Sequence, residues 1–341
     1  MQPIRLFATT GDAVARIDSA GGGRFEVAMS PEGSGAQCLA VDPDDGNRAY
    51  VGTFDQGLWR SLDGGATWEQ AGDAIPHKRV LSVAFAPARR TNGRAAIYAG
   101  TEPSNLYRSE DDGLTWETFP GLPALPSAPS WSFPPRPWTS HVRWIAAHPS
   151  DPETIYVGIE LGGVMRSRDG GITWEDRKPD SQHDCHAIAI HPAAPDRVYE
   201  AAGGGIAWSE DAGATWRPLD DGTDRHYTWG LAIDAGDPNL WYVSATYGAR
   251  EAHRNNGDAR ALIYRKRGDA PWQPLGGSGT LSSPLPHMPY ALLAPRGSPG
   301  VLLAGMQNGE IWLTEDSGEA WRQLDVRLPG LLALGESTRN A

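Results

Sequence analysis

An eight-residue pattern, S-x-D-x-G-x-T-W, recurs along the chain and constrains its fold more than any other feature. Five copies occupy residues 61–68, 109–116, 167–174, 209–216 and 314–321, the last with Thr and Ala at the two hydroxyl positions. Two degenerate copies, 18–25 and 264–272, keep a turn and an aromatic residue at the end position. Such self-similarity along one chain indicates a repeat architecture.

The spacing and internal order of the repeats predict the type of fold. The aromatic end positions, 25, 68, 116, 174, 216, 272 and 321, lie between 42 and 58 residues apart. Within one repeat, apolar runs at 38–41, 49–53 and 57–60 precede the eight-residue pattern. The pattern forms the turn that leads into a fourth run at 67–70. Units of about 40–50 residues with four strands are typical of propeller blades.

We therefore predict an all-β chain that forms a single seven-bladed β-propeller domain over residues 1–341, with four-stranded antiparallel blades. Blade 1 starts at its second strand, so the C-terminal strand is expected to complete it, from residues 4–33 and 328–337. This pairing would leave no exposed sheet edge between the two ends of the chain. Six blades would require that one degenerate repeat be discarded.

The overall charge and the cysteine content limit the partners and the compartment. With 30 basic and 42 acidic residues the formal charge is −12, which disfavours nucleic-acid binding. There is no run of 18 apolar residues and no signal-peptide pattern, so we expect no membrane contact and a cytoplasmic location. Two cysteines fit a reducing compartment. Oligomeric state cannot be inferred from these features.

On these repeats the chain resembles the Asp-box (BNR) repeat propellers, which include sialidases, xyloglucanases, sortilin-like receptors and a photosystem assembly factor. The resemblance implies the propeller fold and places the Asp boxes away from active sites. It does not imply a true sialidase, because the segment 3–6 reads Pro-Ile-Arg-Leu rather than Arg-Ile-Pro. Xyloglucanases of this type use two tandem propellers, whereas this chain has repeats for one.

The aspartates of the boxes (Asp63, Asp111, Asp169, Asp211 and Asp316) are predicted to be structural. Each follows a Ser or Thr by two residues in a glycine-containing turn, where a carboxylate can accept hydrogen bonds from the backbone N–H groups of its own turn. We expect function on the opposite face, which carries the longest links: residues 119–143, 246–260 and 276–290.

Polar side chains at matching positions of the inner strands are the candidate site. They lie eight or six residues before the turn that ends each inner strand, and such positions should converge near the propeller axis. The set comprises Arg79, His141, Arg143, Asp184, His186, Tyr227, Trp229 and His287, with the neighbouring His183 and His226, and Asp55, Glu102, Glu160 and Gln307 from the loops between second and third strands.

Three functions fit this set of residues. In the first, arginines, histidines and aromatic rings bind an anionic small molecule or an acidic peptide. In the second, His141, His186, His226 and His287 hold one transition-metal ion in a lyase or hydrolase. In the third, two carboxylates among Asp55, Glu102, Glu160 and Asp184 act as in a glycoside hydrolase, although the sequence does not select the pair.

Overall fold

The computed structural model describes residues 4–277 and 281–337, and these form seven antiparallel sheets. The fold class is the predicted seven-bladed β-propeller, and each sheet is one blade. The chain divides into two compact units, Met1–Arg177 with Gly335–Ala341, and Lys178–Leu334. Among the described residues, none of the helices has the length and apolar character needed to cross a membrane.

The first unit contains four sheets. The strands, in chain order, are β1 (Arg5–Thr9), β2 (Val14–Gly21), β3 (Arg24–Met29); β4 (Ala36–Val41), β5 (Ala49–Thr53), β6 (Leu58–Ser61), β7 (Glu69–Gln70); β8 (Arg79–Thr91), β9 (Arg94–Glu102), β10 (Leu106–Ser109), β11 (Glu117–Thr118); and β12 (Val142–Ala147), β13 (Ile155–Ile159), β14 (Gly163–Ser167). A short 3-10 helix, Ala128–Ser130, lies in the link before β12.

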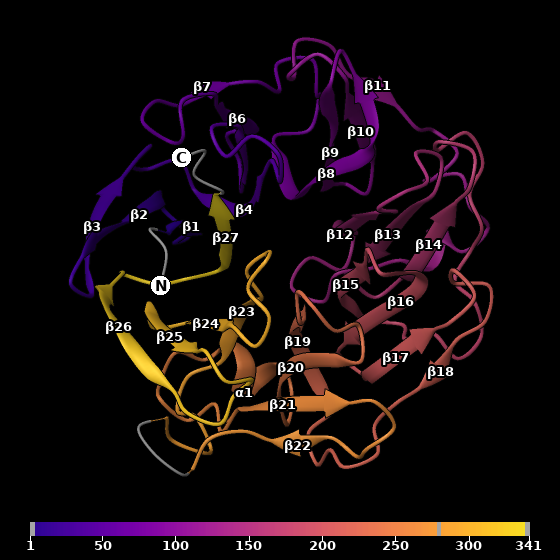
Figure 1. Ribbon diagram of the computed structural model, residues 1–341. Helices are drawn as coiled ribbons and strands as arrows, with labels where there is room; N and C mark the ends of the chain where they lie inside the picture. Colours follow the sequence, from indigo (N-terminus) through magenta and orange to yellow (C-terminus); the bar gives the residue numbers. More distant parts are fainter. Residues whose placement is uncertain (1–3, 278–280, 338–341) are drawn as a thin grey trace. The chain divides into compact units, whose positions relative to one another are not determined.

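The C-terminal strand completes the N-terminal blade, as predicted. β27 (Ala333–Ser337) is hydrogen-bonded to β1 in a sheet of order β27-β1-β2-β3, and Figure 1 shows the yellow β27 beside the indigo strands. The Ser337 hydroxyl also donates to the carbonyl of Gly46 at 2.8 Å. The first and last parts of the chain are therefore joined by one sheet.

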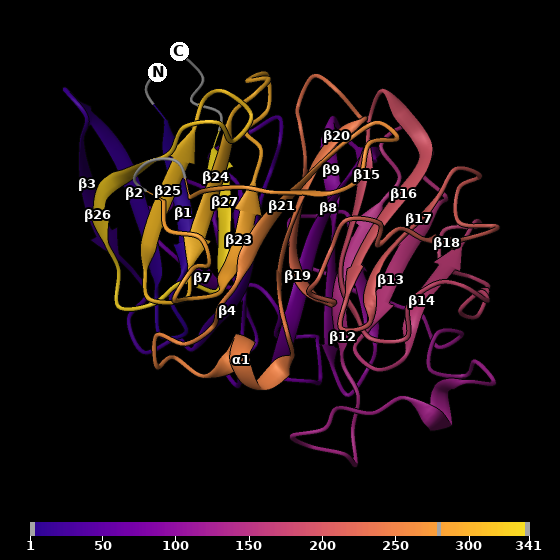
Figure 2. The same ribbon diagram turned by 90° about the horizontal axis from the view of Figure 1, so that it is seen from below.

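The second unit contains three four-stranded sheets. Their strands are β15 (Cys185–His191), β16 (Ala194–Ala202), β17 (Gly205–Ser209), β18 (Arg217–Pro218); β19 (Tyr227–Ile233), β20 (Leu240–Thr246), β21 (Leu262–Arg267), β22 (Gln273–Pro274); and β23 (Pro289–Leu293), β24 (Leu302–Met306), β25 (Glu310–Thr314), β26 (Arg322–Arg327). One helix, α1 (Ala249–His253), lies in the link between β20 and β21, beyond the ends of those strands in Figure 2.

The fourth blade departs from the predicted four strands. Its sheet has three strands, β12-β13-β14, and its outer strand is reduced to an isolated bridge between Arg166 and Glu175. The two residues exchange backbone hydrogen bonds of 3.1 and 2.7 Å. The Arg166 guanidinium also contacts both carboxylate oxygens of Glu175, at 2.9 and 2.8 Å, so the register of the missing strand is kept at one point.

Glycine in the second strand of the blades allows neighbouring blades to pack closely. A Cβ at Gly52 in β5 would lie 2.4 Å from the carbonyl oxygen of Val80 in the next blade, and one at Gly100 in β9 would lie 2.4 Å from Val142. These distances are far below van der Waals contact, so the close packing requires glycine. The second strands β5 and β13 are otherwise fully buried apolar runs.

The Asp-box turns have the structural role predicted for them. In the box at 209–216, the Ser209 hydroxyl and the Thr215 backbone N–H both donate to Asp211 Oδ1 at 2.8 Å, and the Thr215 hydroxyl donates to Oδ2 at 2.7 Å. These hydrogen bonds, the Thr215 backbone bond foremost, lower the pKa of Asp211 to about 2. The carboxylate thus accepts its hydrogen bonds from donors of its own turn.

At three places the tryptophan that ends a repeat binds its blade to the preceding one. The Trp116 indole N–H donates to the carbonyl of Ala71 at 2.9 Å, and Trp68 packs edge-on against Phe7 with ring centroids 6.4 Å apart. The degenerate copy keeps this function without its Asp: the Trp272 indole N–H donates to the carbonyl of Leu219 at 2.6 Å. Each such bond contributes about 1 kcal/mol in addition to the apolar area it buries.

Candidate functional site

In the first unit, a buried carboxylate lies between two arginines. Glu102 ends β9, and its side chain is only 2% exposed. Arg79, the first residue of β8 and the register partner of Glu102, donates to Glu102 Oε1 at 2.9 Å. Arg136, from the link before β12, donates from Nε to Oε1 at 2.7 Å and from Nη2 to Oε2 at 2.5 Å. This fork geometry is the strong, bidentate form of the arginine–carboxylate pair.

Glu102 and Arg136 each stabilise the ionised form of the other. Burial by itself would raise the pKa of Glu102, but the hydrogen bonds and charge of Arg136 and the charge of Arg79 outweigh it and lower that pKa. The hydrogen bond with Glu102 in turn raises the pKa of Arg136. Glu102 and Arg136 are therefore both held in their ionised forms. A carboxyl with a lowered pKa is a poor general acid, so Glu102 is unsuited to the glycosidase role considered for it.

A second carboxylate of the first unit, Glu160, lies in the next blade together with its partners. Glu160, which follows β13, has its Oε2 atom 3.1 Å from His141 Nε2 and 3.7 Å from Arg143 Nε. The side chains of His141 and Glu160 are 5% and 12% exposed, and that of Arg143 is 20% exposed. The sequence placed all three residues at one site, and within this unit the structure brings them together.

Aromatic rings connect the two groups. Phe133 packs edge-on against His141 with centroids 4.8 Å apart, and the Arg136 guanidinium lies 4.7 Å from the same ring. Phe54 lies beneath both Arg79 and Arg136, at 4.7 and 5.3 Å. Cation–π contacts of this kind hold the guanidinium planes in place. We call Arg79, Glu102, Arg136, His141, Arg143 and Glu160 together the arginine cluster.

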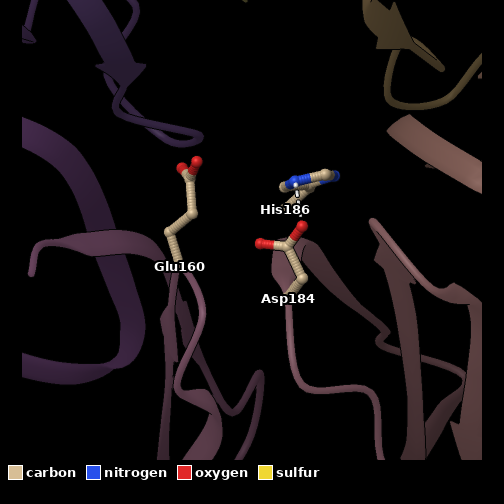
Figure 3. Close-up of side chains that lie close together, drawn as sticks. All are labelled: Glu160, Asp184 and His186. Atoms are coloured by element: carbon tan, nitrogen blue, oxygen red, sulfur yellow. Dashed lines mark ion pairs between the residues drawn. The ribbon is translucent and has the colours of Figure 1, made fainter. Parts of the chain in front are cut away.

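In the second unit, His186 is held in one tautomer. Its ring is 1% exposed, and Nδ1 lies 2.6 Å from the carbonyl oxygen of Thr228. Because a carbonyl oxygen can only accept, Nδ1 carries the hydrogen. His186 Nε2 lies 3.5 Å from Asp184 Oδ2, the pair joined by the dashed line in Figure 3, and among the described residues it has no hydrogen-bond partner.

His186 borders a group of aromatic side chains. Its ring lies 5.0 Å from Tyr227 and 4.5 Å from Trp229, between centroids. Trp229 also contacts Tyr290 at 5.5 Å and His253, the last residue of α1, at 4.8 Å. We call these residues the aromatic cluster.

Both ring nitrogens of His253 are fixed by tyrosine hydroxyls. His253 Nε2 is 2.8 Å from Tyr227 Oη, and Nδ1 is 2.9 Å from Tyr290 Oη. Gln307, which the sequence placed at the site, donates to the same Tyr290 hydroxyl at 3.1 Å and to the His253 carbonyl at 3.4 Å. The link 246–260 is therefore anchored on the aromatic cluster through one imidazole.

The remaining candidates do not join these groups. His183, His226 and Asp55 are exposed to solvent, and His287 is half-buried with Nδ1 unpaired among the described residues. Within the described part of Lys178–Leu334, the ligand atoms of His186, His226 and His287 do not gather into one metal-binding group. The four-histidine metal site thus remains a prediction without geometric support, and part of the link 276–290, residues 278–280, lies outside the described residues.

Sequence reasoning missed five side chains that complete the clusters, among them His253 at the end of α1. Arg136 and Phe133 lie in the proline-rich link 119–143, Tyr290 lies in β23, and Phe54 follows β5. Tyr290 stands one residue after an inner-strand position that was aligned between blades, so the alignment came close to it. Arg136 carries no periodic signal, because the link has no strand; the signal that remained was its place in a long, aromatic-rich insertion. Figure 2 shows this link extending past β12 and β14.

Comparisons with known proteins support the fold. Neither a protein-family model nor a curated protein matches the chain. Similar solved structures include an ancestral GH74 enzyme (TM-score 0.64, 18% identity, 84% of this chain and 38% of that one) and the GH74 xyloglucanase from Xanthomonas campestris (TM-score 0.64, 19% identity, 84% and 45%). The chain thus spans less than half the length of these two enzymes. A third, the structure of YCF48 bound to D1 peptide, matches with TM-score 0.57 and 17% identity, and the match covers 85% of this chain and 82% of that one.

Proposed function

We propose that this chain is a ligand-binding propeller that uses the arginine cluster to recognise carboxylate groups, on an acidic peptide or a small organic anion. One observation carries the proposal: in this cluster the anions are more deeply buried than the cations. Glu102 and Glu160 are 2% and 12% exposed, whereas the side chains of Arg79, Arg136 and Arg143 are 38%, 20% and 20% exposed. A ligand approaching from solvent meets guanidinium groups first.

The charge balance supports the same function. Three arginines face two carboxylates, so the cluster carries an excess of one positive charge in a chain with a formal charge of −12. A guanidinium has five N–H donors. Arg79 uses one of them on Glu102 in the described structure, and Arg136 uses two. The remaining donors are held by Phe54 and Phe133 in fixed planes that suit a carboxylate.

The fold comparison is compatible with peptide binding, since the similar YCF48 structure is that of a protein bound to D1 peptide. We also infer from the five boxes that the chain is an Asp-box repeat propeller. A glycoside hydrolase activity is not proposed, because the GH74 likeness is one of fold and the low pKa of Glu102 opposes acid catalysis.

The test is a binding titration with a fluorescein-labelled hexa-aspartate peptide, followed by anisotropy at low ionic strength, with a hexa-asparagine peptide as the neutral control. We expect binding of the acidic peptide only, and at least about a tenfold loss of affinity in Arg79→Gln and in Arg143→Gln, since charge-assisted hydrogen bonds contribute about 1.5–3 kcal/mol. Displacement of the peptide by citrate would show that a small anion suffices.

The matched control is Arg168→Gln, which removes an exposed arginine from an Asp-box turn of the same unit and should leave the affinity unchanged. Thermal unfolding of each variant checks that the fold is retained. Equal affinity of wild type, Arg79→Gln and Arg143→Gln would contradict the proposal, as would a wild-type protein that binds neither the peptide nor citrate at millimolar concentration.

A further inference from the structure

The distance between Asp184 and His186 is longer than that of a charge-assisted hydrogen bond. A charge-assisted N–H···O bond between an imidazolium and a carboxylate is about 2.7–2.9 Å long. Asp184 Oδ2 and His186 Nε2 are 3.5 Å apart, with the imidazole fully buried (Figure 3). The two atoms are therefore too far apart to share a proton directly in a charge-assisted hydrogen bond.

The tautomer of His186 determines what its Nε2 atom can bind. Its Nδ1–H is used on the Thr228 carbonyl at 2.6 Å, so in the neutral ring Nε2 presents a lone pair toward the carboxylate. Two acceptor atoms that face one another repel unless a cation lies between them. A buried Nε2 without a hydrogen-bond partner among the described residues leaves that position open.

The spacing matches two ligands of one metal ion. Nitrogen and oxygen ligands lie about 2.0–2.2 Å from zinc, and at a tetrahedral angle two such atoms are about 3.4 Å apart. The measured separation is 3.5 Å. Metal-binding histidines also usually donate their other ring N–H to a carbonyl or carboxylate, which is what His186 does with Thr228.

The surroundings keep both ligands in place. Thr228 is fully buried and is itself fixed by its hydroxyl, which donates to the Ala202 carbonyl and accepts from the Ala202 N–H at 2.8 and 2.7 Å. The His186 ring is packed against Tyr227 and Trp229. On the carboxylate side, a Cβ at Gly203 would lie 2.0 Å from Asp184 Oδ2, so glycine at this position preserves the space of the carboxylate.

We propose that Asp184 Oδ2 and His186 Nε2 bind a divalent transition-metal ion of the zinc class. An imidazole nitrogen with a carboxylate oxygen is a donor set typical of such ions. With two ligands from this unit, the ion keeps positions for water or for an oxygen of a bound molecule, where it would act as a Lewis acid. The site uses other residues than the arginine cluster, so this proposal and the carboxylate-binding function succeed or fail separately.

The experiment is a metal titration of protein purified without a histidine tag and stripped with a chelator. Zn²⁺ binding is followed by calorimetry, and Co²⁺ is used as a spectroscopic probe of nitrogen and oxygen ligation. We expect about one equivalent of either ion to bind and to raise the melting temperature, because an ion that binds only the folded state stabilises it. Less than about 0.1 equivalent bound would overturn the proposal.

Two conservative variants identify the ligands. His186→Asn keeps a side-chain N–H near the Thr228 carbonyl but removes Nε2, and Asp184→Asn replaces a carboxylate oxygen by an amide. Each should weaken Zn²⁺ binding by at least about 100-fold, since even outer-shell changes cost 10–100-fold.

His183→Ala and His226→Ala are the matched controls, because both histidines are exposed and close in sequence to the site. They should bind Zn²⁺ as the wild type does. If binding survives in His186→Asn and Asp184→Asn but is lost in His226→Ala, the ion lies elsewhere and the assignment is wrong. Should His186→Asn fail to fold, Asp184→Asn alone decides, because Asp184 is partly exposed and its replacement by Asn conserves shape.

Discussion

Two ion clusters in the first unit have opposite compositions. Around Arg48 a single buried cation is enclosed by two carboxylates: its side chain is 4% exposed and pairs with Asp42 and, at 2.6 Å, with Asp112. Around Glu102 a single buried anion is enclosed by two arginines, which are 20% and 38% exposed. Arginine–carboxylate pairing therefore gives a cluster with a buried cation in one case and a cluster with a buried anion in the other.

The difference separates a structural network from a candidate binding site. Asp42 is 3% exposed and Asp112 12% exposed, so Arg48 and both of its carboxylates are buried, and only Arg94, which pairs with Asp112, is exposed. In the Glu102 network only the anion is almost fully buried, and both arginines are partly exposed. Burying the minority charge and exposing the majority charge leaves the outer groups stabilised, correctly oriented and still able to contact a ligand.

The largest effect is expected for Arg48→Met. The substitution leaves Asp42 and part of Asp112 buried without a counter-charge, which should reduce the free energy of unfolding by about 3–5 kcal/mol. Urea unfolding measures it. Arg94→Met is the control, since Arg94 pairs with the same Asp112 but is 61% exposed and should cost under about 1 kcal/mol. Similar losses in both variants would remove the distinction between closed and open networks.

A smaller effect is expected for Glu102→Gln. The variant keeps the shape of the side chain and an acceptor oxygen, and the two arginines it leaves can turn toward water. The free energy of unfolding should fall by about 1–3 kcal/mol, less than for Arg48→Met. A loss equal to that of Arg48→Met, measured in the same urea series, would mean that the arginine cluster is as closed as the Arg48 network.

The smallest effect is expected for Asp211→Asn, in an Asp-box turn that contacts no ligand in this account. The folded-state pKa of Asp211, about 2, lies below its ordinary value, so the ionised carboxylate stabilises the fold at pH values above the unfolded pKa. That contribution, about 1 kcal/mol, is lost as the pH falls toward 2. Unfolding at pH 7 and pH 3 should show wild type and variant converging; a constant difference would contradict the assigned hydrogen bonds.

The sequence predicted the parts of the fold that follow a period. The strands before each box, the turn chemistry of Asp211 and its counterparts, and the supply of an inner strand by the C-terminus all repeat or complete a repeat, so the pattern was enough to predict them. The outer strand of the fourth blade was predicted in full but is a single bridge at Glu175. Nothing in the box at 167–174 distinguishes that blade from the others.

The candidate site was predictable where it lies on strands or directly at their ends. Arg79, His141, Arg143, Glu102 and Glu160 occupy aligned positions, and within the first unit the structure brings them together. The sequence did not select Arg136 or His253 for the site, because they reach the clusters through links whose conformation is set by tertiary contacts with Glu102 and with Tyr227 and Tyr290. Packing likewise determines which of the predicted histidines are buried, as His186 is.

The most direct test of the central claim, that the arginine cluster presents cations to a carboxylate ligand, is a crystal structure of the protein soaked in citrate. We expect a citrate carboxylate within hydrogen-bond distance, about 2.7–3.0 Å, of the guanidinium groups of Arg79 and Arg136, with Glu102 still paired beneath them. Well-ordered arginines with only water above them at saturating citrate, or citrate bound solely at another place, would contradict the account.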